Sequence, residues 1–177
     1  MQRVRAGRRG QHEGVRTADS KVIARDALPA ERARLKDEGK TVVFTNGCFD
    51  ILHSGHISYL TFARQQGDVL MVGVNSDRSV KQGKGDQRPV NGQDERATVL
   101  AALECVDYVV LFDEDEPAPL IAEIIPDVLV KGEDWAHYVS GREVVEQHGG
   151  KVVLAPLVEG RSTTNTIQRI REVYTAE

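Results

Sequence analysis

Two histidines, His53 and His56, stand three positions apart around Gly55, just after a short apolar run. Near neutral pH an imidazole is either a hydrogen-bond donor or a cation, and both forms stabilise charge that develops on a phosphate. Residues 57–65 carry apolar side chains at helical spacing, so residues 54–56 are expected at the start of a helix. Free N–H groups and the positive end of the helix dipole favour a phosphate there. The pair therefore predicts a phosphate-handling site.

Two other interpretations of the histidines stay open. A single histidine near a helix start is often only a solvated or capping side chain. Zinc is the other candidate ligand, but it takes three or four protein ligands, commonly Cys, Asp or Glu. Cys48 and Asp50 are close in sequence, yet a strand followed by a turn does not obviously bring them together with the histidines. Gly47, which permits close backbone approach, favours the phosphate interpretation.

Alternating apolar runs and helical patterns predict the elements that position this site. Strands are expected at residues 41–44, 68–74, 108–111, 128–130 and 152–154. Helices are expected at residues 28–38, 57–65, 91–103, 119–125, 143–147 and 164–173. The glycine-rich, charged segment 81–86 is predicted to be a mobile loop. Strands that alternate with helices at this spacing indicate an α/β fold, a Rossmann-like, doubly wound parallel sheet with helices on both faces, in a single domain.

Polar clusters follow the apolar runs at residues 45–56, 75–78, 131–135 and 157–164. In open parallel sheets, ligands bind beyond the carboxyl ends of the strands, near the point where the strand order reverses. Because those ends share one edge of the sheet, the four clusters predict one site.

Composition bounds the class of protein. With 177 residues, 40% of them hydrophobic and 28% charged, the chain suits one globular domain. It shows no apolar run near the ~20 residues of a membrane span and no secretory signal, so a cytoplasmic location is expected, without a membrane partner. The net charge of −4 argues against a nucleic-acid partner. Two cysteines, Cys48 and Cys105, are expected to be free buried thiols.

Charge also divides the chain. Residues 1–20 carry a net charge of +3, several glycines and few apolar side chains, so we expect a disordered basic tail there and the folded domain at residues 21–177. A basic arm that binds RNA or a membrane is the alternative interpretation of the tail.

Five segments together resemble a known family: residues 47–56, 74–77, 88–90, 130–132 and 159–164. They are similar to the nucleotidyltransferases marked by a His-x-Gly-His motif, the cytidylyltransferase-like superfamily. Within it, the combination looks most like the adenylyltransferases of D-glycero-β-D-manno-heptose 1-phosphate, over about residues 28–173. These often form the C-terminal half of a bifunctional ADP-heptose synthase. No kinase segment accompanies the motifs in this sequence, so the resemblance is to the stand-alone form.

The resemblance implies a reaction. A phosphate oxygen of a sugar 1-phosphate would attack the α-phosphorus of ATP in one step, and pyrophosphate would leave without a covalent enzyme intermediate. Mg²⁺ would arrive with ATP, held by phosphates and water and not by protein side chains. Catalysis would then be positioning and charge stabilisation. By analogy with relatives, a homodimer is expected.

Residue roles carry over by motif. For catalysis the resemblance implies His53, His56, Arg88 and Lys84. For nucleotide binding it implies Thr45, Asn46, Gly47, Cys48, Phe49, Gly55, Lys131, Gly132, Asp134, Ser162, Thr163 and Thr164. For substrate binding it implies Asp50, Asn75, Asp77, Arg78 and Arg96. Simple N-capping by Ser162 and Thr163, solvated lysines and a surface ion pair at Arg96 are the alternatives.

One departure from the family bears on the substrate. The glycerol-phosphate cytidylyltransferases carry an arginine shortly before the Glu-Gly pair, where this chain has Leu157 and Val158. An arginine follows the pair instead, as Arg161, and its role stays open. The departure leans away from glycerol. A cytidylyltransferase of a polyol phosphate such as glycerol 3-phosphate, and a non-catalytic nucleotide-binding module, are the rival functions.

Overall fold

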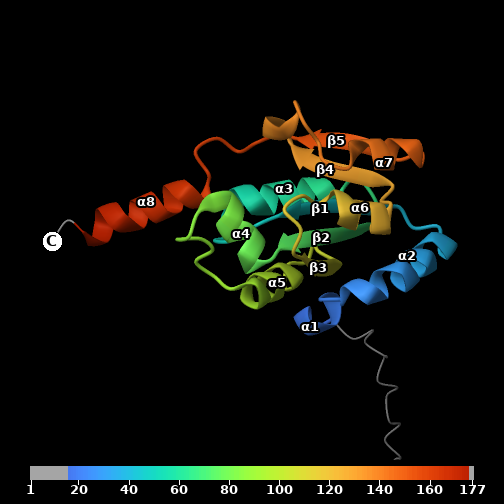
Figure 1. The fold of residues 1–177 in the computed structure, drawn as a ribbon, viewed down its shortest axis with the longest axis horizontal. Helices are drawn as coiled ribbons and strands as arrows, with labels where there is room; N and C mark the ends of the chain where they lie inside the picture. The colour runs from blue at the N-terminus through green and yellow to red at the C-terminus, as the bar shows by residue number, and fades with distance from the viewer. Residues whose placement is uncertain (1–15, 176–177) are drawn as a thin grey trace, which may run out of the picture.

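A five-stranded parallel sheet of order β3-β2-β1-β4-β5 forms the centre of the computed structural model, which describes residues 16–175 (Figure 1). The strands are β1 Val42–Gly47, β2 Val69–Asn75, β3 Tyr108–Phe112, β4 Val128–Gly132 and β5 Lys151–Ala155. After β3, on one edge, the chain crosses to β4 on the other side of β1. The strand order therefore reverses beside β1, which is where parallel sheets bind ligands.

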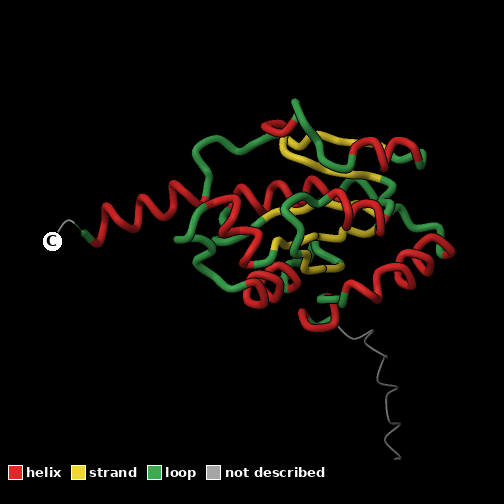
Figure 2. Tube along the Cα trace, in the orientation of Figure 1, coloured by secondary structure: helices red, strands yellow, loops and turns green. Residues whose placement is uncertain are grey.

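Helices cover both faces of the sheet (Figure 2). They are α1 Ala18–Lys21, α2 Leu28–Asp37, α3 Ser54–Arg64, α4 Asp77–Lys84, α5 Gln93–Ala101, α6 Ala118–Ile124, α7 Arg142–Gln147 and α8 Thr163–Tyr174, with short 3₁₀ turns η1 Arg25–Ala27 and η2 Glu133–Trp135. The predicted Rossmann-like α/β fold is confirmed. Its central strands are apolar on both sides because both sides are covered.

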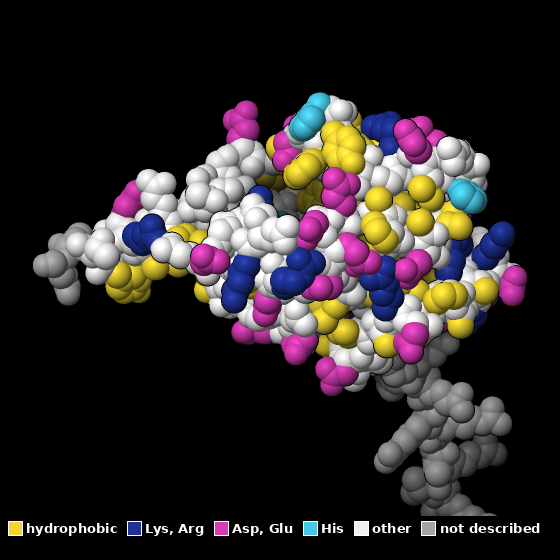
Figure 3. All heavy atoms as spheres, viewed as in Figure 1, with side chains coloured by type: hydrophobic (Ala, Val, Ile, Leu, Met, Phe, Trp, Pro, Cys, Tyr) yellow, Lys and Arg dark blue, Asp and Glu magenta, His cyan; other side chains and the backbone are white. Residues whose placement is uncertain are grey.

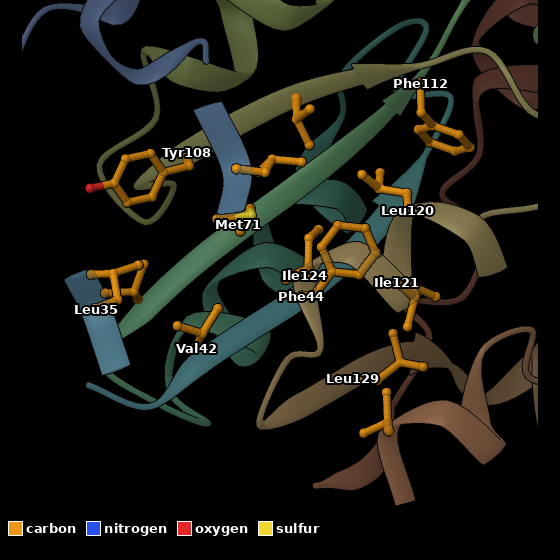
Figure 4. Close-up of a cluster of buried hydrophobic side chains, with 14 of the residues drawn as sticks. Leu35, Val42, Phe44, Met71, Tyr108, Phe112, Leu120, Ile121, Ile124 and Leu129 are labelled. Carbon is orange, nitrogen blue, oxygen red and sulfur yellow. The ribbon is translucent and has the colours of Figure 1, made fainter. Parts of the chain in front are cut away.

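Alternate residues of each strand enter two cores. Phe44 and Met71, paired in the β1–β2 register, pack with Leu120, Ile124 and Leu129 under α2, α6 and α7 (Figure 4). On the opposite face, Val43 and Val72 pack with Leu60 of α3 and Leu100 of α5. All of these side chains have zero exposure. Truncating such a leucine to alanine typically costs about 2–5 kcal/mol, so the cores hold the strand ends firmly in place.

Helix α3 starts at Ser54, so residues 54–56 lie at its start as predicted. Two other local predictions were wrong. Strand β1 continues through Asn46 and Gly47, because both pair with β2, and the turn comes at Phe49, whose φ is 46°. Residues 81–84 belong to α4, because the Ser76 side chain caps that helix by accepting from the Ser79 amide; composition had suggested a loop.

The predicted basic tail is folded in part. Thr17 caps α1, and the Arg16 guanidinium lies 4.5 Å from the centre of the Tyr108 ring. This contact holds residues 16–20 against the body, contrary to the prediction. Residues 1–15 of the predicted tail lie outside the described part of the chain.

Helix α8 extends away from the body and buries none of its residues (Figure 1). Only its start approaches the carboxyl edge of the sheet, as the cavity described below shows. Within residues 16–175, none of the helices has the length and apolar character that crossing a bilayer requires.

Candidate active site

A cavity of about 760 Å³ lies at the carboxyl edge of the sheet. It opens as a hollow between the segment that joins β5 to α8 and helices α3 and α4 (Figure 3). Residues from all four predicted polar clusters line it, together with residues 115–117, Tyr138 and Ser140. The structure therefore brings the four clusters together around one cavity; that this cavity is a functional site stays a prediction.

The turn between β1 and α3 sets the shape of the cavity floor. Phe49 adopts a left-handed backbone conformation and turns its ring back over Gly47. A Cβ at Gly47 would meet that ring at 3.0 Å, so the close packing needs glycine. The same ring contacts His56 edge-on, with the ring centres 5.3 Å apart. The turn therefore fixes the position of one of the two histidines.

His53 and His56 stack on each other, with ring centres 3.8 Å apart and planes inclined by 25°. His53 is the N-cap residue of α3, but its side chain makes no capping hydrogen bond. Among the described residues, neither buried Nδ1 atom has a hydrogen-bond partner. Buried polar atoms are rarely left unpaired, and both rings line the cavity, so the two imidazoles are not committed to other groups of the described chain.

Burial sets the charge of the two rings. Desolvation lowers the pKa of His56 to about 4, with the neighbouring His53 adding to the effect. Desolvation, and next the positive charge of Arg161, lower the pKa of His53. Both rings are therefore neutral at pH 7 in the free protein: they donate N–H groups but bring no charge. Cations from elsewhere in the cavity must supply it.

Gly55 allows the His53 ring and the Arg161 side chain to lie close together. A Cβ at Gly55 would lie 3.0 Å from the His53 ring and 3.2 Å from the Arg161 Cβ. Any larger residue would push the arginine away from the imidazole. The glycine between the histidines is thus explained by packing, in addition to the free amides that begin α3.

Asp50 orients Arg88 from beneath the cavity. The buried carboxylate accepts from the Arg88 Nε and from the amides of Val90 and Asn91, at 2.8 and 3.0 Å. Burial pushes the pKa of Asp50 up, but these amides and Arg88 outweigh it and hold the pKa below its usual value. Among residues 16–175, only the Nε of the Arg88 guanidinium has a hydrogen-bond partner, which leaves its terminal nitrogens for a ligand in the cavity.

Lys131 enters from the end of β4. Its Nζ donates to the Asn46 Oδ1 at 2.7 Å and lies 5.9 Å from the centre of the Trp135 ring. Burial lowers the pKa of Lys131 to about 8, although the carboxylate of Asp134 opposes the shift. The amine is therefore a cation at pH 7 that loses its charge easily.

The start of α8 closes the other side. Ser162 caps this helix by accepting from the Asn165 amide at 3.0 Å, so the capping interpretation of Ser162 holds. Thr163 donates to the Ile51 carbonyl at 3.3 Å, which ties α8 to the turn between β1 and α3. Both line the cavity with Thr164, so capping does not remove them from the site.

Most predicted site residues line this cavity: Asn46, Gly47, Cys48, Phe49, Asp50, His53, Gly55, His56, Asn75, Lys84, Arg88, Lys131, Asp134, Ser162, Thr163 and Thr164. Both cysteines are free but only half-buried, contrary to the fully buried thiols that we expected. Burial raises the pKa of Cys48, so its thiol is protonated.

The other predicted site residues lie outside the cavity lining: Thr45, Asp77, Arg78, Arg96 and Gly132. The Thr45 hydroxyl faces the Tyr59 hydroxyl at 2.6 Å inside the core. Gly132 lies against the side chain of Asp134. Arg78 pairs on the surface with Asp113 and Asp115 instead of facing the cavity.

Arg96 is a structural residue. Its buried guanidinium donates to the carbonyls of Cys48, Asn75 and Asn91, at 2.6, 2.8 and 3.0 Å. It also donates to the Asp77 carboxylate at 2.8 Å. The surface pair that we considered for Arg96 is wrong, because the side chain has zero exposure. Arg96 instead joins the ends of β1 and β2.

Several lining residues were missed by sequence reasoning: Tyr59, Ser79, Asp115, Glu116, Tyr138 and Ser140. The rule that polar residues after a strand line the site applies equally to Asp115 and Glu116, which follow β3. Tyr138 and Ser140 carry no such signal. They reach the cavity because both hydroxyls donate to the Glu116 carboxylate, at 2.9 and 3.0 Å.

Comparison with known proteins places this geometry in a family. The cytidylyltransferase-like family model matches residues 44–175, so the chain belongs to the cytidylyltransferase-like family. Among individual relatives, the "Bifunctional protein HldE" of Geobacter sulfurreducens is 55% identical over 160 residues, 90% of this chain and 33% of the relative. The protein of the same name from Campylobacter fetus is 54% identical over 154 residues, 86% of this chain and 32% of the relative. The chain thus spans about a third of the length of these relatives.

Solved structures agree on the fold. A lipopolysaccharide core biosynthesis protein from Thermoplasma volcanium is 28% identical, with a TM-score of 0.57, and the match covers 70% of this chain and 100% of that one. The pantoate-beta-alanine ligase of Francisella tularensis is 17% identical, with a TM-score of 0.58, over 87% of this chain and 77% of that one. The second likeness supports the fold alone.

Proposed function

We propose that this chain transfers AMP from ATP to D-glycero-D-manno-heptose 1-phosphate, giving ADP-heptose and pyrophosphate. The observation that carries the proposal is the stacked pair of neutral imidazoles with free Nδ1 atoms, in a cavity that also holds lysine and arginine side chains. Membership of the cytidylyltransferase-like family supports nucleotidyl transfer. The motif resemblance and the lipopolysaccharide-related structural relative support a heptose phosphate as the acceptor.

In this proposal the histidines and the cations of the cavity have different roles in catalysis. His53 and His56 donate hydrogen bonds to the phosphates, while Arg88 and Lys131 supply positive charge. The acceptor phosphate oxygen forms a bond to the α-phosphorus, the bond from the α-phosphorus to the bridging oxygen breaks, and pyrophosphate leaves with the electron pair. Preorganised donors and cations stabilise this transition state without a covalent intermediate.

The acceptor sugar has a natural place beside β2 and β3. Asp115, Glu116 and Tyr138 line that part of the cavity, where carboxylates would repel a triphosphate but accept hydrogen bonds from sugar hydroxyls. We therefore propose that the nucleotide lies on the β4–β5 side and the sugar on the β2–β3 side. Of the predicted substrate residues, Asn75 lies on this side of the cavity.

We propose that Mg²⁺ arrives with ATP and is held largely by phosphates and water. Within residues 16–175, no group of three or more His, Cys, Asp and Glu side chains could hold a metal ion, and the Asp50 carboxylate is taken by Arg88 and two amides. Phosphates and water would therefore hold the ion, which would neutralise phosphate charge. The homodimer and the cytoplasmic location stay predictions.

The test is a pyrophosphate-release assay with ATP or CTP against a panel of sugar 1-phosphates and glycerol 3-phosphate. We expect turnover with ATP and the heptose 1-phosphate. Turnover with CTP and glycerol 3-phosphate alone would contradict the proposal in favour of a cytidylyltransferase. Nucleotide binding without turnover on any acceptor would favour a non-catalytic module.

A further inference from the structure

The cations of the cavity differ in what holds them. Arg88 donates to the Asp50 carboxylate. Lys131 donates to the Asn46 side chain, and the negative charge of Asp134 favours its protonated form. Arg161, in contrast, has no side-chain hydrogen bond or ion pair with any residue of the described range 16–175, and it lines the same cavity. An arginine without a counter-charge among the described residues, in the same cavity as the two histidines, is available to an anionic ligand.

The position of Arg161 is set by packing on both sides. Its Cβ lies 3.2 Å from the place where a Cβ on Gly55 would stand, and the His53 ring lies 3.0 Å from the same place, so the absence of a side chain at Gly55 makes room for both. Arg161 directly precedes Ser162, the N-cap of α8. The arginine therefore stands between the starts of α3 and α8, so a ligand there would face two helix N-termini and one guanidinium.

We propose that Arg161 binds the β- and γ-phosphates of the nucleotide and neutralises the pyrophosphate as it leaves. This inference rests on the proposed function. The two histidines are neutral and add no charge of their own, so charge that builds on the departing group needs a cation within reach. Arg161 keeps its proton throughout; it donates N–H groups to phosphate oxygens that gain charge as the bond to the α-phosphorus breaks.

Ligand binding by Arg161 would also affect the start of helix α8. Binding of the triphosphate would join Arg161 to the ligand and add to the hydrogen bond by which Thr163 already holds the start of α8 to the turn between β1 and α3. Because α8 buries none of its residues, little else in the body holds its direction. The arginine is thus a binding residue whose contact with ligand also orders the edge of its own site.

The test compares Arg161→Ala and Arg161→Lys with wild type, using inorganic pyrophosphate as the probe in isothermal titration calorimetry. Loss of a charge-assisted contact should weaken pyrophosphate binding by about tenfold or more in Arg161→Ala, and by less in Arg161→Lys. Arg169→Ala is the matched control, because Arg169 lies on α8, is highly exposed and pairs with Glu172. It should bind pyrophosphate as wild type does.

A second readout excludes a merely structural role. Burial lowers the pKa of His53 most, and the charge of Arg161 lowers it further, so an NMR titration of the His53 ring should show a higher pKa in Arg161→Ala than in wild type and a wild-type pKa in Arg161→Lys. Unchanged pyrophosphate affinity in Arg161→Ala, or an equal loss in Arg169→Ala, would overturn the proposal. Neither readout needs the acceptor: if no sugar phosphate supports turnover, the proposed function fails while these measurements still decide the role of Arg161.

Discussion

Two polar clusters meet at the carboxyl edge of the sheet, and they differ in whether their atoms already have partners. The arginine cluster, made of Arg96, Asp77 and the carbonyls of Cys48, Asn75 and Asn91, is bonded together within the protein. The histidine turn, residues 53–56, leaves both buried Nδ1 atoms without partners among the described residues.

The difference separates groups that hold the site from groups that serve a ligand. A buried guanidinium whose donors are all used stabilises the fold, and removing it leaves acceptors unpaired. A buried nitrogen without a partner costs stability until a ligand pairs with it. The four predictions below test this contrast, from the largest expected effect to the smallest.

Arg96→Met should separate fold from function most clearly. It removes four hydrogen bonds from a fully buried guanidinium, so the free energy of unfolding should fall by about 3–5 kcal/mol. Urea denaturation measures the loss. Arg78→Met is the control, since its pairs with Asp113 and Asp115 are exposed and should contribute about 1 kcal/mol or less. Equal losses in the two variants would break the comparison.

His56→Asn should show the opposite behaviour. Loss of one preorganised donor should reduce kcat by about 10²–10³-fold, while the free energy of unfolding changes by about 1 kcal/mol or less. Steady-state pyrophosphate release and urea denaturation measure the two effects. His148→Asn provides the matched control, because His148 is exposed at the end of α7. A variant of His56 that is unstable but fully active would place the histidine turn with the arginine cluster.

Lys131 makes a prediction about alkaline pH. Because its pKa is about 8, the free enzyme loses this positive charge as the pH rises through 8. The value of kcat/KM for ATP should therefore fall by up to about tenfold per pH unit above 8, since kcat/KM reports groups of the free enzyme. Lys131→Arg keeps its charge and should flatten the profile, whereas Lys151→Arg, at the exposed start of β5, should not. A wild-type profile that stays level to high pH would contradict this role.

Low pH should reduce the stability of the folded protein, because His56 is buried in its neutral form. The pKa of His56 is about 4 when folded, below 6.5 for the exposed side chain, so between these values the unfolded chain binds a proton that the folded chain does not. The free energy of unfolding should therefore fall as the pH drops from about 6.5 toward 4, by up to about 2 kcal/mol after allowing for partial solvent screening of the ring. Urea denaturation at several pH values checks this. His56→Asn should have a shallower slope; parallel slopes would exclude His56 as the cause.

Local patterns in the sequence predicted the sheet well. Val42–Phe44 and Val69–Val74 are continuous apolar runs, and such runs are typical of buried parallel strands covered on both faces. Helix α4 was missed because Gly83 and the lysines around it suggested a loop. The Ser76 cap was the available signal, but a single serine before a charged segment is weak evidence without the structure.

Prediction of the site also succeeded for local motifs and failed for contacts between distant segments. Motif spacing found the histidine turn and the segments that meet it, and the cavity contains them. It also assigned Arg96 and Arg78 to substrate binding. In the structure, Arg96 donates to backbone carbonyls and Arg78 pairs with surface carboxylates. Tyr138 and Ser140 were not found, because their place depends on Glu116, more than twenty residues earlier.

The sequence by itself determined the strand and helix order, the pair of imidazoles and the polar residues that follow each strand, because these depend on neighbours along the chain. Only the tertiary structure decided which charged groups are already paired. Asp50 meets Arg88 across 38 positions, and Arg96 meets the Cys48 carbonyl across 48. Pairing depends on distances of a few ångströms between segments that packing brings together, and no local pattern records those distances.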